Sequence, residues 1–344
     1  MTSAAILGSG SFGTAFATLL AAKLDDVVLI GRDEATAAAI NRNHHNPHYL
    51  KDVALASNIR ASIDPAEAKK HPLIVFAVPT AAFRSVASHL ASLGLPEETI
   101  LLSCTKGIEM KTGVRMTEIL REIFPNNPIA AVSGPNHAEE LAASLASCAV
   151  IGSNDEELAM QLQDLLTLPH FRSYTSDDLA GIELGGAVKN VFAIAAGIAH
   201  GLGLGDNAVA ALVTRALAEM TRLGTALGGQ VETFCGLSGV GDLIVTCFSE
   251  HSRNHRVGLA LGKGKSLNEA VASLGMVAEG VPNTLSIHNA ARKAGVRTPI
   301  IDAVFSILYQ DKPAAQAMHE LLSRDPRPEA DISRPPVPAA PPES

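Results

Sequence analysis

The sequence has no tryptophan, and aromatic residues make up only 4% of its 344 residues. Charged residues are also few, at 18%, whereas hydrophobic residues reach 47%. This balance is typical of a globular protein with large buried helices. The net charge of −8 lacks the basic excess that binding a phosphate backbone requires, so it argues against a nucleic-acid partner.

Cysteine is scarce too: the chain has four cysteines, which are far apart and form no CxxC pair. We therefore expect reduced thiols in a cytoplasmic protein. A basic signal-peptide start is missing, since Thr2 and Ser3 lead directly into an apolar run. The most membrane-like segment, 184–199, is short for a span and carries Lys189 and Asn190. We expect it to be a buried helix and expect no membrane span.

Histidines cluster in a single loop at His44, His45 and His48. The loop is rich in asparagine and proline and has no carboxylate pair or cysteine nearby, so we expect no metal site.

Strand-like and helix-like segments alternate in the first half of the chain, as in βαβ units. We expect strands at 4–8, 26–31, 72–79, 99–106, 129–135 and 147–153, with 52–64 a less clear candidate. Helical patterns between them include 11–22, 34–43 and 80–93. The fold class is therefore α/β, with an N-terminal Rossmann-type, doubly wound, mostly parallel sheet.

The pattern changes after about Thr175 to long periods rich in alanine and leucine. We expect helices around 184–199, 207–227, 255–262, 266–274, 283–294 and 301–309. Because the chain is too long for one ordinary core, we divide it into a dinucleotide-binding domain (1–180), an all-helical substrate domain (181–324) and a flexible proline-rich tail (325–344).

A glycine triplet follows the first strand, where Gly8, Gly10 and Gly13 fit the pattern G-x-G-x-x-G at the start of a helix. The first glycine allows a tight turn, the second lets backbone approach a pyrophosphate, and the third lets helix pack on strand. Unpaired N–H groups at the helix N-terminus favour the phosphates. A purely structural turn is the alternative.

The end of the second strand bears on the choice of cofactor. Arg32 stands where a guanidinium could bind a 2′-phosphate, and Asp33 follows it. We favour NADPH, with NADH possible; the alternative reading is a solvated Arg–Asp pair.

Two further strand ends carry polar residues at the edge of the sheet where ligands bind. Lys106 follows one strand and suits contact with an anion or carbonyl. Gly134 makes a turn after another strand, and Asn136 can hydrogen-bond a ligand there.

Lys189 is the most informative residue, because an ammonium within an apolar helix needs a partner. Gly185 and Gly186 lie one turn before it and thin the helix face, as where another group approaches closely. Burial lowers a lysine pKa toward the range of acid–base catalysis. Asp242, in a glycine-rich turn, is the candidate carboxylate that orients it.

A helix start at Ser252, with Arg253 and Asn254 in its first turn, combines N–H groups, a guanidinium and an amide. This combination suits a phosphate, although an ordinary capped helix is the alternative. Val277 and Glu279 lie in a loop near another helix start.

Taken in order, these stretches resemble the bacterial NAD(P)-dependent glycerol-3-phosphate dehydrogenase family. The resemblance covers residues 4 to about 310, and its most specific segments are GGAVKN, GLSGVGDL and SRN. Phe12 stands where the family commonly has tryptophan, and Asn136 where it commonly has serine or threonine. The proline-rich tail has no counterpart.

The resemblance implies reversible reduction of dihydroxyacetone phosphate to sn-glycerol 3-phosphate, a phospholipid precursor, by a homodimer. It implies Lys189 as general acid and base, with Asp242 and Lys106 as its catalytic partners. The implied cofactor contacts are Ser11, Phe12, Arg32, Tyr49, Lys106, Ala138, Arg253, Val277 and Glu279. The implied substrate contacts are Lys106, Gly134, Asn136, Lys189, Asp242, Ser252, Arg253 and Asn254. Two alternatives are a β-hydroxyacid dehydrogenase, which needs a carboxylate site, and a non-catalytic NADPH-responsive regulator, which needs no proton donor.

Overall fold

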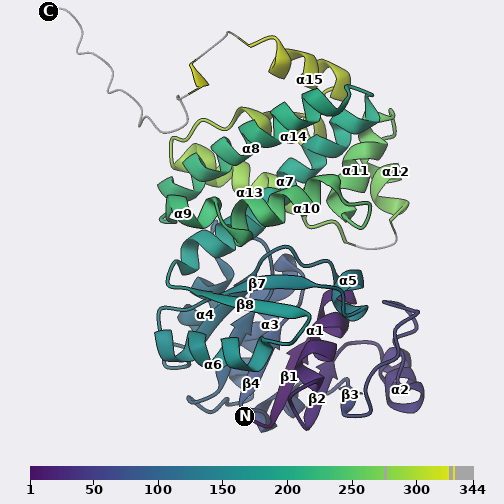
Figure 1. Ribbon diagram of the computed structural model, residues 1–344, viewed down its shortest axis with the longest axis vertical. Coiled ribbons are helices and arrows are strands. Elements are labelled where there is room, and N and C mark those ends of the chain that lie inside the picture. Colours follow the sequence, from purple (N-terminus) through teal and green to yellow (C-terminus); the bar gives the residue numbers. More distant parts are fainter. Residues whose placement is uncertain (275–276, 325–327, 330–344) are drawn as a thin grey trace, which may run out of the picture.

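The chain forms a sheet half and a helical half that lie one above the other (Figure 1). This computed structural model describes residues 1–274, 277–324 and 328–329. Apart from 328–329, the expected proline-rich tail lies outside the described residues.

In the part of the chain that the structure describes, eight strands form one sheet in the order β3-β2-β1-β4-β5-β6-β7-β8. All neighbouring strands are parallel except β6 and β7, which are antiparallel. The mostly parallel, Rossmann-type sheet is therefore confirmed. The strands are β1 (Ser3–Leu7), β2 (Asp26–Ile30), β3 (Ile59–Ser62), β4 (Leu73–Phe76), β5 (Ile100–Ser103), β6 (Ile129–Ser133), β7 (Ser147–Gly152) and β8 (Phe171–Ser176).

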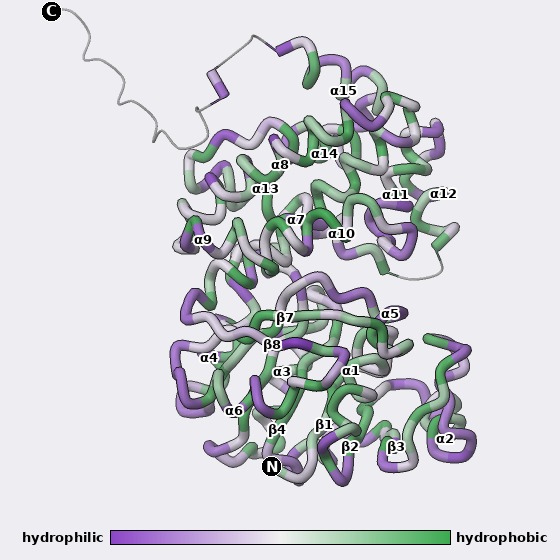
Figure 2. Tube along the Cα trace, viewed as in Figure 1, coloured by the Kyte–Doolittle hydropathy of each residue, from purple (hydrophilic) through white to green (hydrophobic). Residues whose placement is uncertain are grey.

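Helices cover both faces of the sheet, so the central strands are apolar on both sides. In β1, Ile6 packs in the core on one face with Phe16. Leu7 packs on the other face with Phe83. Figure 2 shows apolar residues running through the sheet and through the middle of the helical half. The helices of this half are α1 (Ser11–Ala21), α2 (Glu34–Asn43), η1 (Pro65–Lys70), α3 (Thr80–Ser92), α4 (Met116–Ile123), α5 (Ala138–Ala142) and α6 (Glu156–Leu166).

Strand β8 is absent from the sequence-based prediction, and β3 is there only an unclear segment. Both are edge strands that bury side chains on one face only, and in β8 one of the buried side chains, Ser173, is polar. In β8, Arg172, Tyr174 and Thr175 are exposed. The mixture of polar and apolar residues weakens the apolar run that identifies the central strands.

The second half of the chain is built around α7 (Leu179–Gly201), whose residues 181–199 are all buried. The expected buried helix is therefore confirmed. Its neighbours are α8 (Asp206–Ala226), α9 (Val231–Phe234), η2 (Leu237–Gly241), α10 (Asp242–Phe248), α11 (Arg253–Gly262), α12 (Leu267–Ala272), α13 (Gly280–Lys293), α14 (Pro299–Tyr309) and α15 (Ala314–Leu322).

Within the described residues, two helical segments are long and apolar enough to cross a membrane by length and composition alone. One is α7, whose apolar window is entirely buried inside the protein, as is typical of a core helix. The other, Val231–Phe248, has 39% of its window buried and is divided among α9, η2 and α10.

Glycines allow α7 and α11 to pack backbone against backbone. A Cβ at Gly197 would lie 2.1 Å from the carbonyl oxygen of His255, and one at Gly258 would lie 2.0 Å from that of Ile194. Any larger residue must therefore push the two helices apart. This close packing holds the first turn of α11 beside the middle of α7.

We expect Gly258→Ala to lower the free energy of unfolding by about 3 kcal/mol, because overpacking forces backbone shifts. Urea denaturation of the purified chain measures this. Gly241→Ala is the matched control: Gly241 has helical backbone angles (φ −61°, ψ −50°), and the nearest atom to its added Cβ is 3.7 Å away. An equal loss of stability in both variants would contradict the packing explanation.

Candidate active site

The glycine loop lies between the end of β1 and the start of α1, where the strand order reverses between β1 and β4. Gly8 has φ +117°, and a Cβ there would lie 2.5 Å from the carbonyl oxygen of Ala77. A Cβ at Gly13 would lie 1.9 Å from the carbonyl oxygen of Gly8. These two glycines are therefore required by the turn itself.

Gly10 differs from the other two, because among the described residues no atom beyond its chain neighbours lies within 4 Å of the Cβ position that it lacks. It is the N-cap of α1, and no side chain caps this helix end. A ligand can thus approach backbone N–H groups at the positive end of the helix dipole. Ser11, the first residue of α1, is buried beside it. The loop fits the pyrophosphate of a dinucleotide, which needs close approach to backbone.

Asn46 holds a second loop against the glycine loop, and sequence reasoning missed it. It is fully buried, and its side-chain amide donates to the carbonyl oxygen of Ser9 at 3.0 Å and to the hydroxyl of Thr14 at 2.9 Å. Its oxygen accepts from the backbone N–H of Tyr49 at 3.1 Å. Asn46 therefore fixes the half-buried Tyr49 close to the glycine loop. Its position three residues before Tyr49, an implied cofactor contact, is the signal that could have found it.

At the end of β2, Asp33 caps α2 and accepts from the backbone N–H of Thr36 at 3.1 Å. This backbone hydrogen bond holds the pKa of Asp33 below its usual range. Arg32 is exposed and makes no hydrogen bond or ion pair with any described residue. The adjacent carboxylate serves the helix, so the guanidinium remains available to an anion.

Phe12 and Ala138 lie close to the same loop. Phe12 is half-buried in the first turn of α1 and stacks on Phe16, with ring centroids 6.0 Å apart. Ala138 is the first residue of α5, which packs against α1. Both positions border the expected cofactor site. None of the hydrogen bonds among the described residues joins these residues, Arg32 or Tyr49 to the lysines described next.

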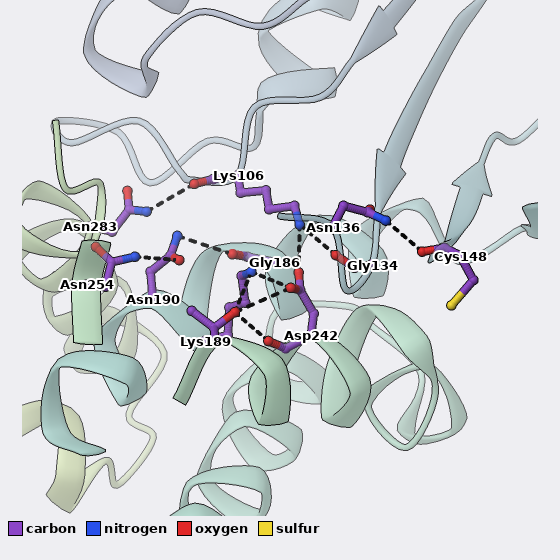
Figure 3. A network of polar contacts seen from close by, with 11 residues as sticks. Lys106, Gly134, Asn136, Cys148, Gly186, Lys189, Asn190, Asp242, Asn254 and Asn283 are labelled. Atoms are coloured by element: carbon purple, nitrogen blue, oxygen red, sulfur yellow. Dashed lines mark hydrogen bonds and ion pairs between the residues drawn. The ribbon is translucent and has the colours of Figure 1, made fainter. Parts of the chain in front are cut away.

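The carboxylate of Asp242 accepts hydrogen bonds from two ammonium groups, one from each half of the chain (Figure 3). Lys106, after β5, donates from Nζ to Oδ2 of Asp242 at 2.8 Å. Lys189, from α7, donates to Oδ1 of the same carboxylate. The side chain of Asp242 is 1% exposed, that of Lys189 7% and that of Lys106 16%. The structure thus brings together the three residues expected to be catalytic.

Burial has opposite electrostatic effects on the members of this cluster. Burial, together with the nearby ammonium of Lys106, lowers the pKa of Lys189 to about 7, although Asp242 opposes the shift. Burial alone would raise the pKa of Asp242, but the ammonium groups of Lys106 and Lys189 hold it below its usual range. Near neutral pH, Lys189 can therefore both hold and release a proton, while Asp242 stays ionised.

Thr246 is a further member of the cluster that sequence reasoning missed. Its hydroxyl donates to the backbone carbonyl of Asp242 at 2.5 Å and accepts from Nζ of Lys189 at 2.9 Å. It lies one helical turn after Asp242, on the same face of α10. That i, i+4 spacing in GDLIVT is the signal that could have found it.

Gly185 and Gly186 admit protein groups to the face of α7. A Cβ at Gly185 would lie 2.5 Å from the carbonyl oxygen of Ser238, in the η2 segment that leads to Asp242. A Cβ at Gly186 would lie 2.7 Å from the hydroxyl of Ser133 and 3.4 Å from the Lys106 side chain. The expected close approach is therefore present, and the two glycines make room for the groups that deliver Asp242 and Lys106 to Lys189.

Gly134 and Asn136 border the cluster after β6. The carbonyl oxygen of Gly134 accepts from Nζ of Lys106 at 2.8 Å, and Gly134 has φ +146°. The amide of Asn136 donates to the carbonyl oxygen of Cys148 at 2.7 Å, whereas its buried oxygen makes no hydrogen bond with any residue that the structure describes. That oxygen is suited to a hydroxyl or amine of a ligand.

Ser252 caps α11 as expected, accepting from the backbone N–H of His255 at 3.2 Å. Asn254 donates to the side-chain oxygen of Asn190 at 2.9 Å and accepts from the backbone N–H of Gly280 at 2.9 Å. The first turn of α11 is thus tied to α7, one residue from Lys189, and to the start of α13. Asn190 is another residue of the site that was not predicted from the sequence.

The loop before α13 connects the two halves beside the site. Arg253 donates to the carbonyl oxygen of Val277 at 2.9 Å, which brings two expected cofactor contacts together. Glu279 accepts from the backbone N–H of Thr80, at the start of α3, at 3.2 Å. Burial raises the pKa of Glu279, and its second oxygen is buried without a hydrogen bond to the described part of the chain. A hydroxyl or amide donor of a cofactor suits that oxygen.

A Rossmann-type sheet joined to a helical domain that carries a buried lysine–aspartate pair defines a class of nicotinamide-dependent dehydrogenases. Comparison with known proteins agrees. The family models for the N-terminus and C-terminus of NAD-dependent glycerol-3-phosphate dehydrogenase match residues 3–159 and 178–319. This chain belongs to that family, as its sequence resemblance indicated, and is an oxidoreductase that uses NAD(P).

Two curated relatives and one solved structure illustrate the similarity. The glycerol-3-phosphate dehydrogenase (NAD(P)+) of Moorella thermoacetica is 45% identical over 323 residues, covering 94% of this chain and 96% of the relative. That of Clostridium botulinum is 43% identical over 326 residues, covering 94% and 98%. The crystal structure of glycerol-3-phosphate dehydrogenase from Coxiella burnetii superposes with a TM-score of 0.91 at 38% identity, covering 94% and 99%.

We expect Asp242→Asn to lower the free energy of unfolding by about 3 kcal/mol or more at pH 7, because removing one partner leaves buried ammonium groups uncompensated. Chemical denaturation measures this. The matched control is Asp26→Asn, since Asp26 pairs with Arg60 at 2.9 Å but is 40% exposed, and exposed pairs contribute less than about 1 kcal/mol. A loss at Asp242 no larger than at Asp26 would contradict the assigned role of burial.

Proposed function

We propose that this chain catalyses the reversible NAD(P)H-dependent reduction of dihydroxyacetone phosphate to sn-glycerol 3-phosphate. The observation that carries the proposal is the single buried carboxylate that holds Lys189 and Lys106 together in a chain of this family. The product is a three-carbon phosphate ester with two hydroxyl groups, which suits it as a precursor of phospholipid head groups and backbones.

Lys189 acts as the general acid of the reduction. Asp242 and Thr246 accept two of its three N–H bonds, so their geometry directs the third. That N–H donates its proton to the carbonyl oxygen of the substrate as this oxygen becomes an alkoxide. In the reverse direction, the neutral amine removes the proton of the hydroxyl group. Such acid–base catalysis typically contributes 10²–10⁴-fold.

Lys106 supplies a second positive charge beside the same carboxylate. With both lysines protonated, the three groups carry a net charge of about +1, which stabilises a developing alkoxide in a site screened from water. The first turn of α11, with Ser252, Arg253 and Asn254, holds the substrate phosphate through N–H groups and a guanidinium. We assign substrate contacts to Gly134 and Asn136 as well.

The glycine loop holds the dinucleotide, with Phe12, Tyr49, Ala138, Val277 and Glu279 around it. When bound there, the nicotinamide supplies the hydride that adds to C2 of the ketone. We propose a preference for NADPH over NADH, supported by the exposed guanidinium of Arg32 and the engagement of Asp33 as a helix cap. Steady-state kinetics with both cofactors measures the preference.

We further propose a cytoplasmic homodimer in which a dinucleotide domain (1–180) precedes a helical substrate domain (181–324). The domain boundary is supported by the end of β8 at Ser176 and the start of α7 at Leu179. Ile244 and Phe248 are 48% and 50% exposed, one turn apart on α10, and are suited to cover each other in a second copy. Sedimentation velocity reports the oligomeric state. All four cysteines are unpaired, in keeping with a reducing compartment.

We expect Lys189→Met to reduce kcat for dihydroxyacetone phosphate by at least about 100-fold while NADPH still binds, because only the proton donor is lost. NADPH absorbance follows turnover, and fluorescence titration follows binding. Lys263→Met, on the exposed end of α11, is the control and should retain wild-type turnover. Turnover of Lys189→Met within a few-fold of wild type would refute the acid role. If the wild-type chain turned over hydroxy acids instead of dihydroxyacetone phosphate, a β-hydroxyacid dehydrogenase would be favoured. If it bound NADPH but turned over neither substrate, a regulator would be favoured.

The pKa of about 7 for Lys189 predicts opposite pH dependences for the two directions. Reduction needs the protonated amine, so its kcat/KM should fall as pH rises through about 7. Oxidation of sn-glycerol 3-phosphate needs the neutral amine, so its kcat/KM should rise over the same range. Initial rates from pH 6 to 9 test this, and profiles with the same slope in both directions would contradict it.

A further inference from the structure

Lys106 lies on the short connection after β5, and its ammonium reaches Asp242 across the boundary between the two halves of the chain. Its long side chain has four rotatable bonds, so the position of Nζ depends on where the backbone is held. Thr105 fixes one side of this backbone, donating from its hydroxyl to the carbonyl oxygen of Val78 at 2.7 Å. The other side of this backbone faces the helical half of the chain.

Asn283 occupies that place (Figure 3). It lies in the first turn of α13, and its side-chain amide donates to the backbone carbonyl of Lys106 at 3.1 Å. Asn283 is 1% exposed, so water cannot easily replace this hydrogen bond, and its loss would leave a buried carbonyl group without a partner. The donor comes from the helical half and the acceptor from the sheet half, 177 residues apart in the sequence.

Gly107, the next residue, is enclosed by the same group. A Cβ at Gly107 would lie 2.2 Å from the hydroxyl oxygen of Thr80 and 2.8 Å from the side-chain oxygen of Asn283. Thr80 begins α3, and its backbone N–H donates to Glu279, in the loop before α13. The Lys106–Gly107 backbone is therefore held between the starts of α3 and α13.

We propose that Asn283 is a positioning residue for Lys106. It acts through the backbone of Lys106 and touches neither substrate nor cofactor in this scheme. By fixing that backbone, it keeps the Lys106 ammonium on Oδ2 of Asp242, which leaves Oδ1 to Lys189. The inference rests on the proposed function, since that reaction is where the position of Lys106 matters.

Removing the amide donor should release Lys106 from its position. We expect Asn283→Leu to lower kcat for dihydroxyacetone phosphate by about 10–100-fold, because misplacement of a catalytic group by about 1 Å has effects of this size. The affinity for NADPH should stay within threefold of wild type. The pH midpoint of the reduction should also move upward, because a displaced Lys106 repels the Lys189 ammonium less.

Two further variants make the test decisive. Asn283→Asp keeps the shape of the side chain but cannot donate a hydrogen bond when ionised, so its activity should fall as that of Asn283→Leu does. If Asn283→Leu fails to fold, Asn283→Asp provides the test. Asn127→Leu is the control. Asn127 is 5% exposed and donates to the carbonyl oxygens of Pro96 and Thr99 at 2.8 and 2.9 Å. Pro96 and Thr99 precede the start of β5, whereas Lys106 follows its end. Asn127→Leu should lose stability while keeping the wild-type kcat and pH midpoint.

The outcomes separate the two proposals. In one outcome, the wild-type chain turns over dihydroxyacetone phosphate while Asn283→Leu and Asn283→Asp keep kcat within threefold of wild type. That result would overturn the positioning role and leave the proposed function standing. A loss of activity with an unchanged pH midpoint, matched by Asn127→Leu, would overturn the positioning role too, as the mark of a general structural defect. A wild-type chain that does not reduce dihydroxyacetone phosphate would overturn both proposals.

Discussion

One buried carboxylate, that of Asp242, is the interaction on which the site depends. It lies where the halves of the chain meet and neutralises ammonium groups from each of them. Without it, two positive charges would face each other in a region of low dielectric constant, which is among the most costly arrangements in a protein interior. The same arrangement keeps the pKa of Lys189 near neutrality, because burial favours the neutral amine while Asp242 favours the ammonium.

Glycines make this arrangement sterically possible. Those of α7 admit the backbone of η2 and the side chain of Lys106, and those facing α11 bring its first turn close to Lys189. A helix of larger residues would bury its apolar face equally well, but it would hold these groups several ångströms apart. The small residues of α7 thus serve the geometry of the site as well as the packing of the core.

Much of the architecture was predictable, because central strands and core helices have strong periodic patterns. The apolar runs that became β1, β4 and β5 are buried on both faces, and α7 is buried all round. The pattern failed at β8, where polar side chains outnumber apolar ones at the sheet edge. In the site, Lys189 was identified by its ammonium group within an apolar helix, and Asp242 by its carboxylate in a glycine-rich turn. Asn46, Thr246 and Asn283 gave weaker signals, because uncharged polar residues are common in loops and on helices, and it is their partners in the fold that distinguish them.

The kinds of group present can be identified from the amino-acid sequence alone: a glycine loop after a strand, a lysine in an apolar helix, a carboxylate in a glycine-rich turn. These follow from local rules, since each depends on neighbours within a few positions of the chain. Which groups meet was decided only by tertiary structure. Lys106 and Asp242 are 136 residues apart, and Asn283 and Lys106 are 177 apart. Their contacts arise from the packing of α7, α10 and α13 against the sheet edge, because hydrogen bonds and ion pairs act over a few ångströms whatever the separation along the chain.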